Sequence, residues 1–318
     1  MFRRKRSDTK VASIEEQYGL DLGVRGDMKL GRLLQLTGCE TVTDLRSLGS
    51  DGIRRRLARA RPQPDPQITS YLEHLLVKYA LRPQDEEAIR RARAQYEGLL
   101  LGGWEGGNPR IRYAGSVAKG TAIRVSYDLD MVLYFPAESA MSISECYEAV
   151  ERRLRSARRR PKRRNVALRV QHPGFHVDIV PGKTLKSDSR YANLYVSGAR
   201  TTRQTSIEQH VAHVREGGLR DVLQILKLWR VRHKVPIGSF AIELATAEAL
   251  RGYQDPKLDR RVMRVLEFLR DDFQSARLLD PANSNNIISD LVSLHNKRRV
   301  AEIAARGCSE DFWKHVVW

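Results

Sequence analysis

The sequence places two aspartates, Asp128 and Asp130, one residue apart in the otherwise apolar run DLDMVLYF. This run has the length and composition of a β-strand. Side chains alternate between the two faces of a strand, so both carboxylates should project from the same face, roughly 7 Å apart. Two carboxylates so placed repel each other and lose hydration unless a cation lies between them. Mg²⁺ fits such a pair, because it prefers oxygen ligands and completes its shell with water and phosphate oxygens.

A third aspartate, Asp178, lies in a second β-rich run, FHVDIV. If the two strands are neighbours in a sheet, the three acids could hold two Mg²⁺ ions, which Mn²⁺ can replace. In such a site one ion lowers the pKa of an attacking hydroxyl, and the other stabilises the leaving pyrophosphate. The pattern therefore indicates a two-metal phosphoryl-transfer site.

The segment GSVAKGT, just upstream of the paired aspartates, supplies groups that bind phosphate. Gly115 lets the backbone approach a triphosphate closely, and Ser116 offers a hydroxyl and an N–H group. Lys119 and Thr121 could add further donors. The order G-x-x-x-x-G-K-[ST] is absent, so this is not a P-loop.

The elements that would position these groups follow a simple order along the chain. Residues 1–62 form an N-terminal accessory module, followed by a linker containing Pro62, Pro64 and Pro66. Residues 67–101 have a helical pattern. Strands and helices alternate up to residue 205, including a helix capped by Ser142 or Ser144. Helices dominate residues 206–318. We expect an α/β domain of catalytic type in residues 67–205 and a helical lobe in 206–318.

The composition limits the class of protein. The 318 residues carry a formal net charge of +18 and a sequence pI near 10.1, which attracts nucleotides and nucleic acids. Three scattered cysteines (Cys39, Cys146 and Cys308) predict neither a disulfide framework nor a structural zinc site. No apolar run is long enough to span a membrane, and no apolar segment of a secretory signal follows the basic N-terminus. We therefore expect a cytoplasmic protein without a membrane partner.

These motifs together resemble the nucleotidyltransferase superfamily of the DNA polymerase β type. Within that superfamily, the motifs are most similar to those of the group that contains oligoadenylate synthetase, cyclic GMP–AMP synthase and the bacterial CD-NTases. GSVAKGTAIRVSYDLDMVLYF resembles the oligoadenylate synthetase core. LRDVLQILKLWR, VPIGSFAIELATAEAL and LLDPANSNN resemble, in the same order, segments of that family's helical lobe. The resemblance covers about residues 67–318.

The resemblance implies roles for individual residues. Asp128 and Asp130 would bind both metal ions, while Asp178 would bind one and help to activate the acceptor hydroxyl. The residues implied to bind the donor phosphates are Gly115, Ser116, Lys227 and Ser239. Glu243 is expected to be structural and to pair with an arginine.

The implied fold is α+β. It combines a polymerase-β-like lobe, which has a mixed sheet and includes a spine helix, with a helical lobe that closes a nucleotide cleft. The implied activity is template-independent nucleotidyl transfer from NTPs, making short linear or cyclic oligonucleotide signals in antiviral or antiphage defence. A downstream effector would bind the product. Three alternatives stay open: an RNA 3′-end enzyme of the CCA-adding or poly(A) polymerase type, a nucleic-acid-binding relative without turnover, and an enzyme that nucleotidylates small molecules.

Two other patterns carry weaker predictions. The run RRLRSARRRPKRR contains nine basic residues in thirteen and predicts a contact with RNA or DNA phosphates. The residues proposed for this contact are Arg158, Arg159, Arg160, Lys162, Arg163 and Arg164. His210 and His213 have the spacing of a metal-binding pair, but no third ligand accompanies them, so a core or surface pair is expected.

Overall fold

The computed structural model describes residues 30–60, 67–104 and 107–317, in two compact units, residues 1–70 and 71–318. Residues 1–29 of the predicted accessory module, and the proline-containing linker, lie outside the described residues. In the first unit, α3 (Leu30–Thr37) and α4 (Val42–Ala60) enclose a small apolar core centred on Leu33, Leu45 and Ile53. At Gly49, inside α4, φ is 62°, which kinks the helix.

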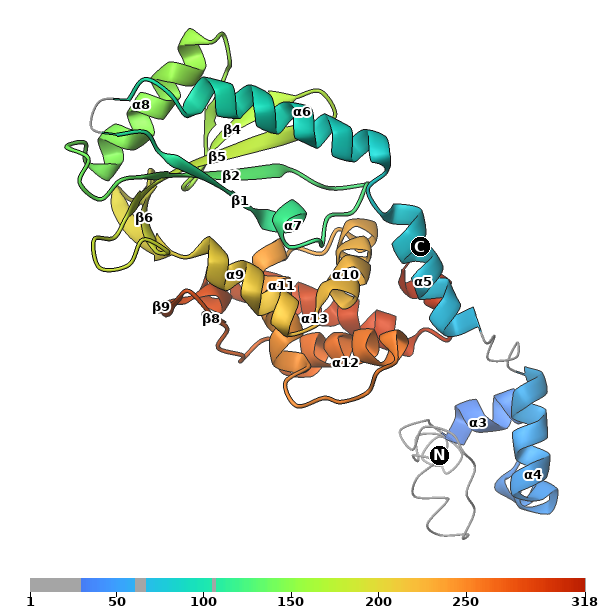
Figure 1. Ribbon diagram of the computed structural model, residues 1–318. Helices are drawn as coiled ribbons and strands as arrows, with labels where there is room; N and C mark the ends of the chain where they lie inside the picture. Colours follow the sequence, from blue (N-terminus) through green and yellow to red (C-terminus); the bar gives the residue numbers. More distant parts are fainter. Residues whose placement is uncertain (1–29, 61–66, 105–106, 318) are drawn as a thin grey trace. The chain divides into compact units, whose positions relative to one another are not determined.

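The second unit contains a seven-stranded sheet (Figure 1). The strand order is β1-β2-β5-β4-β3, and β6 and β7 continue from β5. Only β2 and β5 pair in parallel; the other pairs are antiparallel, so the sheet is mixed, as predicted. The strands are β1 (Arg110–Ala114), β2 (Leu129–Phe135), β3 (Lys162–Arg163), β4 (Leu168–His172), β5 (Phe175–Thr184), β6 (Ala192–Val196) and β7 (Thr201–Thr205).

The alternation of side chains gives the two faces of the sheet different environments. Leu129, Met131 and Leu133 of β2 pack beneath α6 (Pro83–Leu100) and α8 (Ile143–Ser156), which cover one face (Figure 1). Residues of even number in β2 face the other way, toward the helical part of the unit. Of the two predicted caps for α8, Ser142 is the one used, because its hydroxyl accepts from the backbone N–H of Glu145.

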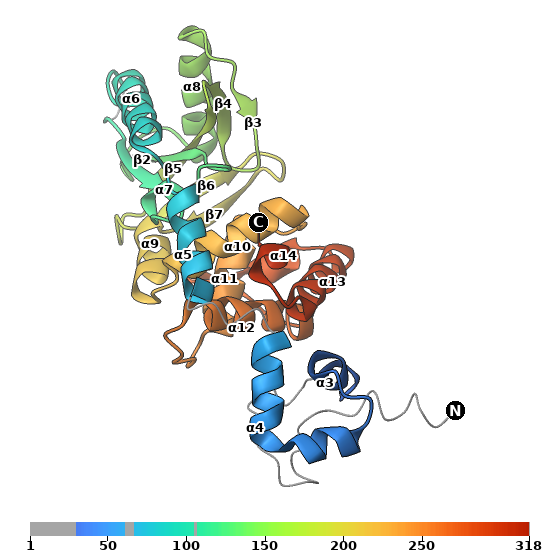
Figure 2. The ribbon, with the colours of Figure 1, turned by 90° about the vertical axis from the view of Figure 1, so that its right-hand side faces the viewer.

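The helices after residue 206 surround a second core. Trp229 of α10 is fully buried there, and α5 (Gln67–Tyr79) adds Leu72 and Leu75 to the same core (Figure 2). The elements are α9 (Ile207–Glu216), α10 (Arg220–His233), α11 (Ser239–Ala249), α12 (Leu258–Asp271), β8 (Leu279–Asp280), β9 (Asn283–Ile287), η1 (Ile288–Leu291), α13 (Leu294–Ser309) and α14 (Trp313–Val316). No helix of the described residues is long and apolar enough to cross a membrane.

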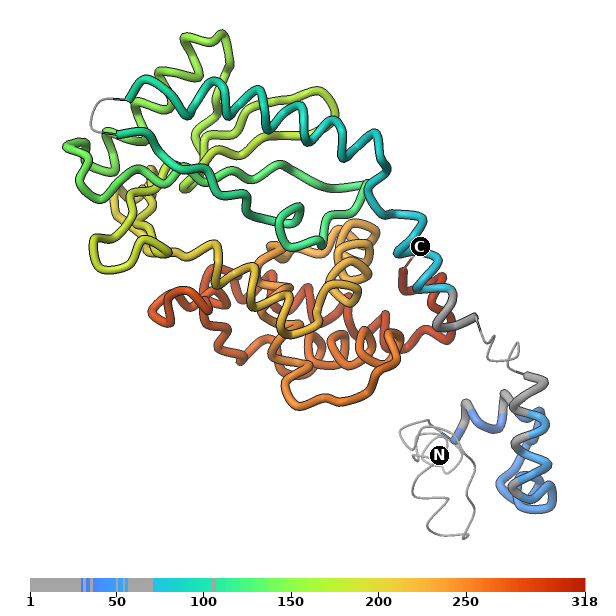
Figure 3. Tube along the Cα trace, viewed as in Figure 1, coloured from blue at the N-terminus to red at the C-terminus, as the bar shows by residue number. Residues whose placement is uncertain are grey.

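The helical pattern of residues 67–101 is divided into two helices. Arg82 has an extended conformation (φ −87°, ψ 161°) ahead of Pro83, the first residue of α6. The two helices serve different cores, since α5 packs among the helices and α6 packs on the sheet. The chain end returns to α5, where the Tyr71 hydroxyl donates to the Val317 carbonyl (Figure 3).

The buried face of β2 should dominate the stability of the sheet. Leu133 has no exposed surface, so Leu133→Ala should lower the free energy of unfolding by about 2–5 kcal/mol through lost burial and a residual cavity. The measurement is urea unfolding followed by circular dichroism. The control is Val77→Ala, because Val77 is 79% exposed and its truncation should cost little. Equal losses in the two variants would contradict the assignment of this core.

Candidate active site

A row of charged residues crosses the sheet on the face opposite α6 and α8. Asp130 of β2 is the register partner of Asp178 on the parallel strand β5. Asp178 is in turn paired with Arg169 of β4, and Arg169 with Lys162 of β3. The two aspartate-bearing strands are therefore neighbours, which is the condition for the three acids to share metal ions. Two acids and then two bases follow one another across four strands. Only the central pair, Asp178 with Arg169, joins opposite charges and is stabilising, while the two outer pairs place like charges side by side.

Asp128 lies one residue before β2 begins, so it is not inside the strand as the pattern suggested. Its carboxylate is partly exposed. Arg169 joins it to the row: Nη2 lies 3.0 Å from Oδ2 of Asp128. The same guanidinium donates two hydrogen bonds to Asp178, from Nε to Oδ1 at 2.8 Å and from Nη2 to Oδ2 at 2.6 Å. Charge-assisted, forked contacts of this kind are strong and directional.

Asp130 is the least compensated of the three acids. Among the described residues, no side-chain hydrogen bond reaches its carboxylate. The pKa of Asp130 is raised to about 7. Burial is the largest cause, the neighbouring carboxylates of Asp178 and Asp128 add to it, and the charges of Arg169 and Lys119 oppose it. A buried acid in such a field favours either a proton or a cation.

The glycine turn lies directly against this acid. Gly115 begins the short helix α7 (Gly115–Ala118) with φ of +60°, a conformation that side-chain-bearing residues rarely adopt. A Cβ atom there would lie 1.7 Å from Oδ2 of Asp130, so only glycine fits. The sequence predicted a glycine at this position to admit a phosphate. The structure adds a second reason, which is the close approach of the carboxylate. Ser116, the next residue, is half-buried.

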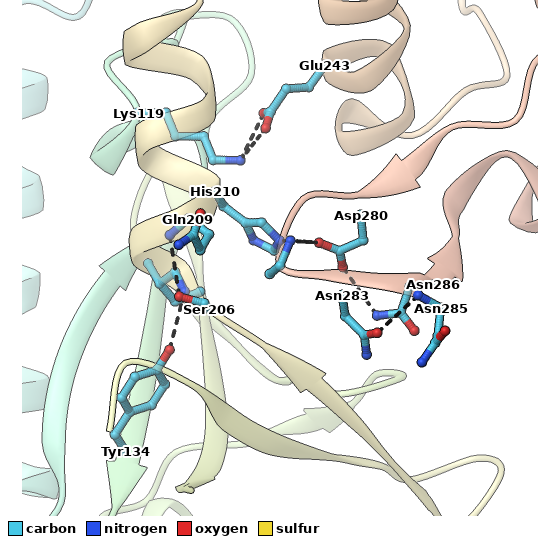
Figure 4. Close-up of polar contacts among 12 residues, drawn as sticks. Lys119, Tyr134, Ser206, Gln209, His210, Glu243, Asp280, Asn283, Asn285 and Asn286 are labelled. Atoms are coloured by element: carbon cyan, nitrogen blue, oxygen red, sulfur yellow. Dashed lines mark hydrogen bonds and ion pairs between the residues drawn. The ribbon is translucent and has the colours of Figure 1, made fainter. Parts of the chain in front are cut away.

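Lys119 and Glu243 form a buried ion pair between the turn and α11 (Figure 4). The Lys119 ammonium lies 2.7 Å and 2.9 Å from the two carboxylate oxygens, and each side chain is 8% exposed. The expected partner of Glu243 was an arginine, and this detail was wrong. Lys119 was predicted to bind phosphate, but in this structure its charge is compensated by Glu243.

Lys227 and Thr121, both predicted to contact phosphate, contact each other. Nζ of Lys227 donates to the carbonyl and the hydroxyl of Thr121, at 2.9 Å and 2.8 Å. Burial lowers the pKa of Lys227 to about 8, so the side chain stays mainly protonated at neutral pH. Ser239 is exposed and begins α11. The structure thus brings the turn against α10 through Lys227, as the Lys119 pair brings it against α11.

The three aspartates offer only oxygen atoms, which suits Mg²⁺. Within the described ranges, however, no three Asp, Glu, His or Cys side chains are arranged to hold a metal ion. The cation against two of the aspartates is the guanidinium of Arg169, which the sequence patterns did not single out.

A second polar cluster joins α9 to the β8–β9 hairpin (Figure 4). Nε2 of His210 lies 2.7 Å from Oδ1 of Asp280, whose other oxygen accepts from Asn286. Burial opposes ionisation of Asp280, but the contacts with His210, the Ala282 backbone and Asn286 together outweigh it, so the pKa of this carboxyl is lowered. Asp280 and Asn286 belong to the LLDPANSNN motif, so the motif serves to fix α9. His210 therefore has a structural partner that its spacing from His213 did not reveal.

The basic run lies at the end of α8 and on β3. Arg163 pairs with the buried Glu151, and Arg159 is half-buried beside Tyr96. Four of the six predicted contact residues are exposed and have no ion-pair partner among the described residues: Arg158, Arg160, Lys162 and Arg164. The charge that is free to meet a polyanion is thus smaller than the sequence suggests.

No protein-family model and no curated protein matches the chain. Solved structures do share its fold. They include CdnC of E. coli MS115-1 in complex with HORMA-deltaN (TM-score 0.62, 20% identity, covering 76% of this chain and 89% of that one). Another is the CD-NTase CdnG of Bradyrhizobium diazoefficiens in complex with GTP (0.58, 15%, 77% and 91%). A third is the c-UMP-AMP synthase CdnE of Rhodothermus marinus (0.54, 14%, 78% and 98%). The chain therefore has the fold of the CD-NTase nucleotidyltransferases.

The raised pKa of Asp130 predicts a pH-dependent effect on stability. An acid whose pKa is higher in the folded state contributes stability below its ordinary pKa of 3.8 and loses it as the pH rises through about 7. Asp130→Asn should therefore gain stability relative to wild type between pH 4 and pH 8, on the order of a few kcal/mol. Urea unfolding in EDTA at both pH values measures this difference.

The control for that experiment is Asp290→Asn, because Asp290 is exposed. Its stability relative to wild type should change little with pH. If the stability of Asp130→Asn relative to wild type were as independent of pH as that of the control, the pKa of Asp130 would not be raised in the folded protein.

Proposed function

We propose that this chain is a metal-dependent nucleotidyltransferase that makes short oligonucleotide signals from NTPs without a template. The observation that carries the proposal is the in-register pair Asp130 and Asp178 directly beneath the Gly115 turn. The fold supports it, because the similar structures include complexes with ATP and with GTP, and a c-UMP-AMP synthase. We further propose cyclic or linear products of a few nucleotides, which an effector reads in antiphage defence.

The proposed roles of the residues follow from their positions. Asp128, Asp130 and Asp178 would hold two Mg²⁺ ions, which would lower the pKa of the acceptor hydroxyl and stabilise the departing pyrophosphate. The Gly115 turn leaves the backbone N–H groups of α7 near Asp130 for the donor phosphates. Lys227 adds a buried positive charge behind that turn, and this charge favours a bound triphosphate.

The test is product formation by the purified chain. Wild type is incubated with labelled ATP, GTP, CTP and UTP, and then with dNTPs, in Mg²⁺ or Mn²⁺, and phosphatase-treated products are identified by mass. Asp128→Ala and Asp130→Ala should abolish pyrophosphate release, since each removes a shared metal ligand, while circular dichroism shows a folded protein. Asp290→Ala is the matched control and should keep wild-type activity.

Near-wild-type activity in Asp128→Ala or Asp130→Ala would contradict the site. The competing function, RNA 3′-end extension, predicts a different result: no product from NTPs alone, and added tRNA lengthened by one or more nucleotides. The basic surface at α8 and β3 is the feature that favours this second function.

We also propose that this basic surface binds RNA, as an activator or as an inhibitory ligand. Two of its four exposed members are Lys162, the first residue of β3, and Arg164, which directly follows β3; neither has an ion-pair partner in the described part of the chain. Lys162→Glu combined with Arg164→Glu should weaken binding of a 20-base-pair RNA at least tenfold and flatten its dependence on salt concentration. Fluorescence anisotropy at 50–200 mM salt gives both quantities.

The control must change the total charge by the same amount elsewhere. Lys186→Glu with Lys257→Glu does this at two exposed positions outside α8 and β3. If the control weakened binding as much as the test variant, the affinity would come from the overall charge of the protein and the proposed surface would be wrong.

A further inference from the structure

Arg169 makes the strongest set of contacts to the three aspartates, although no motif drew attention to it. Its guanidinium bonds both oxygens of Asp178 and one oxygen of Asp128. The hydrogen bonds to Asp178 raise the pKa of the guanidinium, which therefore stays charged at every relevant pH. One cation thus spans two of the three acids, and those acids are the proposed metal ligands.

The backbone fixes the position of this arginine. Its neighbours Leu168 and Val170 are buried on the α6 and α8 side of the sheet, so Arg169 must project from the aspartate side. The β4–β5 hairpin turns at Pro173 and Gly174, and its register pairs Arg169 with Asp178. A shift of the strand by one residue would bury the charge, so the strand cannot carry the guanidinium away. The side chain itself can move, because it is 26% exposed.

The contacts of Arg169 compete directly with a divalent ion. Both oxygens of Asp178 and Oδ2 of Asp128 already accept hydrogen bonds from it, and Oδ1 of Asp128 lies 3.4 Å from the backbone nitrogen of His176. A metal ion bound by these acids would use the same carboxylate oxygens. A guanidinium and a divalent cation bound to the same carboxylates would also repel each other. The two cations therefore cannot both make their best contacts with these acids.

We propose that Arg169 is a positioning residue that holds Asp128 and Asp178 together and keeps the affinity of the nucleotide-free protein for divalent ions low. This inference rests on the proposed function, since it takes the three aspartates as metal ligands. Tight metal binding then requires the negative charge of a nucleoside triphosphate. This charge attracts the ion and offers the displaced guanidinium a new anionic partner. The arginine thereby couples metal binding to substrate binding.

The test measures Mn²⁺ binding to the full chain without any nucleotide, from the electron paramagnetic resonance signal of free Mn²⁺. Arg169→Gln removes the charge and keeps a hydrogen-bonding side chain, and it should bind Mn²⁺ at least tenfold more tightly than wild type. Arg169→Lys loses the forked hydrogen bonds but keeps a positive charge that repels Mn²⁺, so its affinity should stay within about threefold of wild type. Arg90→Gln removes one positive charge from the exposed face of α6 and should match wild type.

The outcomes separate cleanly. Equal affinity in wild type and Arg169→Gln, both folded by circular dichroism, would overturn the inference, as would an equal gain in Arg90→Gln or Arg169→Lys. A gain in Arg169→Gln that Asp178→Asn reverses would support it, because a merely structural arginine would not change metal affinity in this way. Wild-type product formation together with unchanged affinities would overturn only the role of Arg169. Absence of Mn²⁺ binding by wild type even with a nonhydrolysable ATP analogue would overturn the proposed function as well.

Discussion

The constraint on which the site depends is the electrostatic cost of placing three carboxylates on one face of a sheet. Parallel pairing of β2 with β5 puts Asp130 beside Asp178. Asp128 joins them because it lies one residue before β2 begins. Burial alone makes ionisation of Asp130 unfavourable. A protein keeps such a group only where the lost stability has another use. Two neighbours reduce this cost. Gly115 leaves room for the Asp130 carboxylate, and the Arg169 guanidinium compensates part of the negative charge of Asp178 and Asp128.

A second layer of buried charge connects this row to the helices. Lys119 pairs with Glu243 of α11, and Lys227 of α10 donates to Thr121, so the end of the glycine turn that follows α7 is fixed to the helical part of the unit. Removing one partner of a buried ion pair leaves the other charge uncompensated, which is far more costly than removing both. Any ligand that bonds to Lys119 must therefore also satisfy Glu243, and movement of the turn is coupled to α10 and α11.

Local spacing and residue type were enough to predict the two aspartate-bearing strands and the glycine turn. The mixed sheet was predicted from the family resemblance, and the adjacency of the two strands entered only as a condition that the structure meets. The sequence did not predict features that depend on register or on distant contacts. Arg169 looks like any arginine in a basic chain until strand pairing places it against Asp178. The pairing of Lys119 with Glu243 joins residues 124 positions apart. Pro83 was visible, but the continuous helical pattern on either side concealed the break that it makes.

The central claim is that the aspartate row is a nucleotide-dependent metal site from which Arg169 is displaced. The most direct measurement is a crystal structure of the full chain with a nonhydrolysable NTP and Mn²⁺, whose anomalous scattering locates the ions. Mn²⁺ should be bound at Asp128, Asp130 and Asp178, and the triphosphate should lie at the Gly115 turn. The Arg169 guanidinium should be turned away from Asp178. Bound nucleotide with no ion at these acids and with the Arg169 contacts intact would contradict this claim.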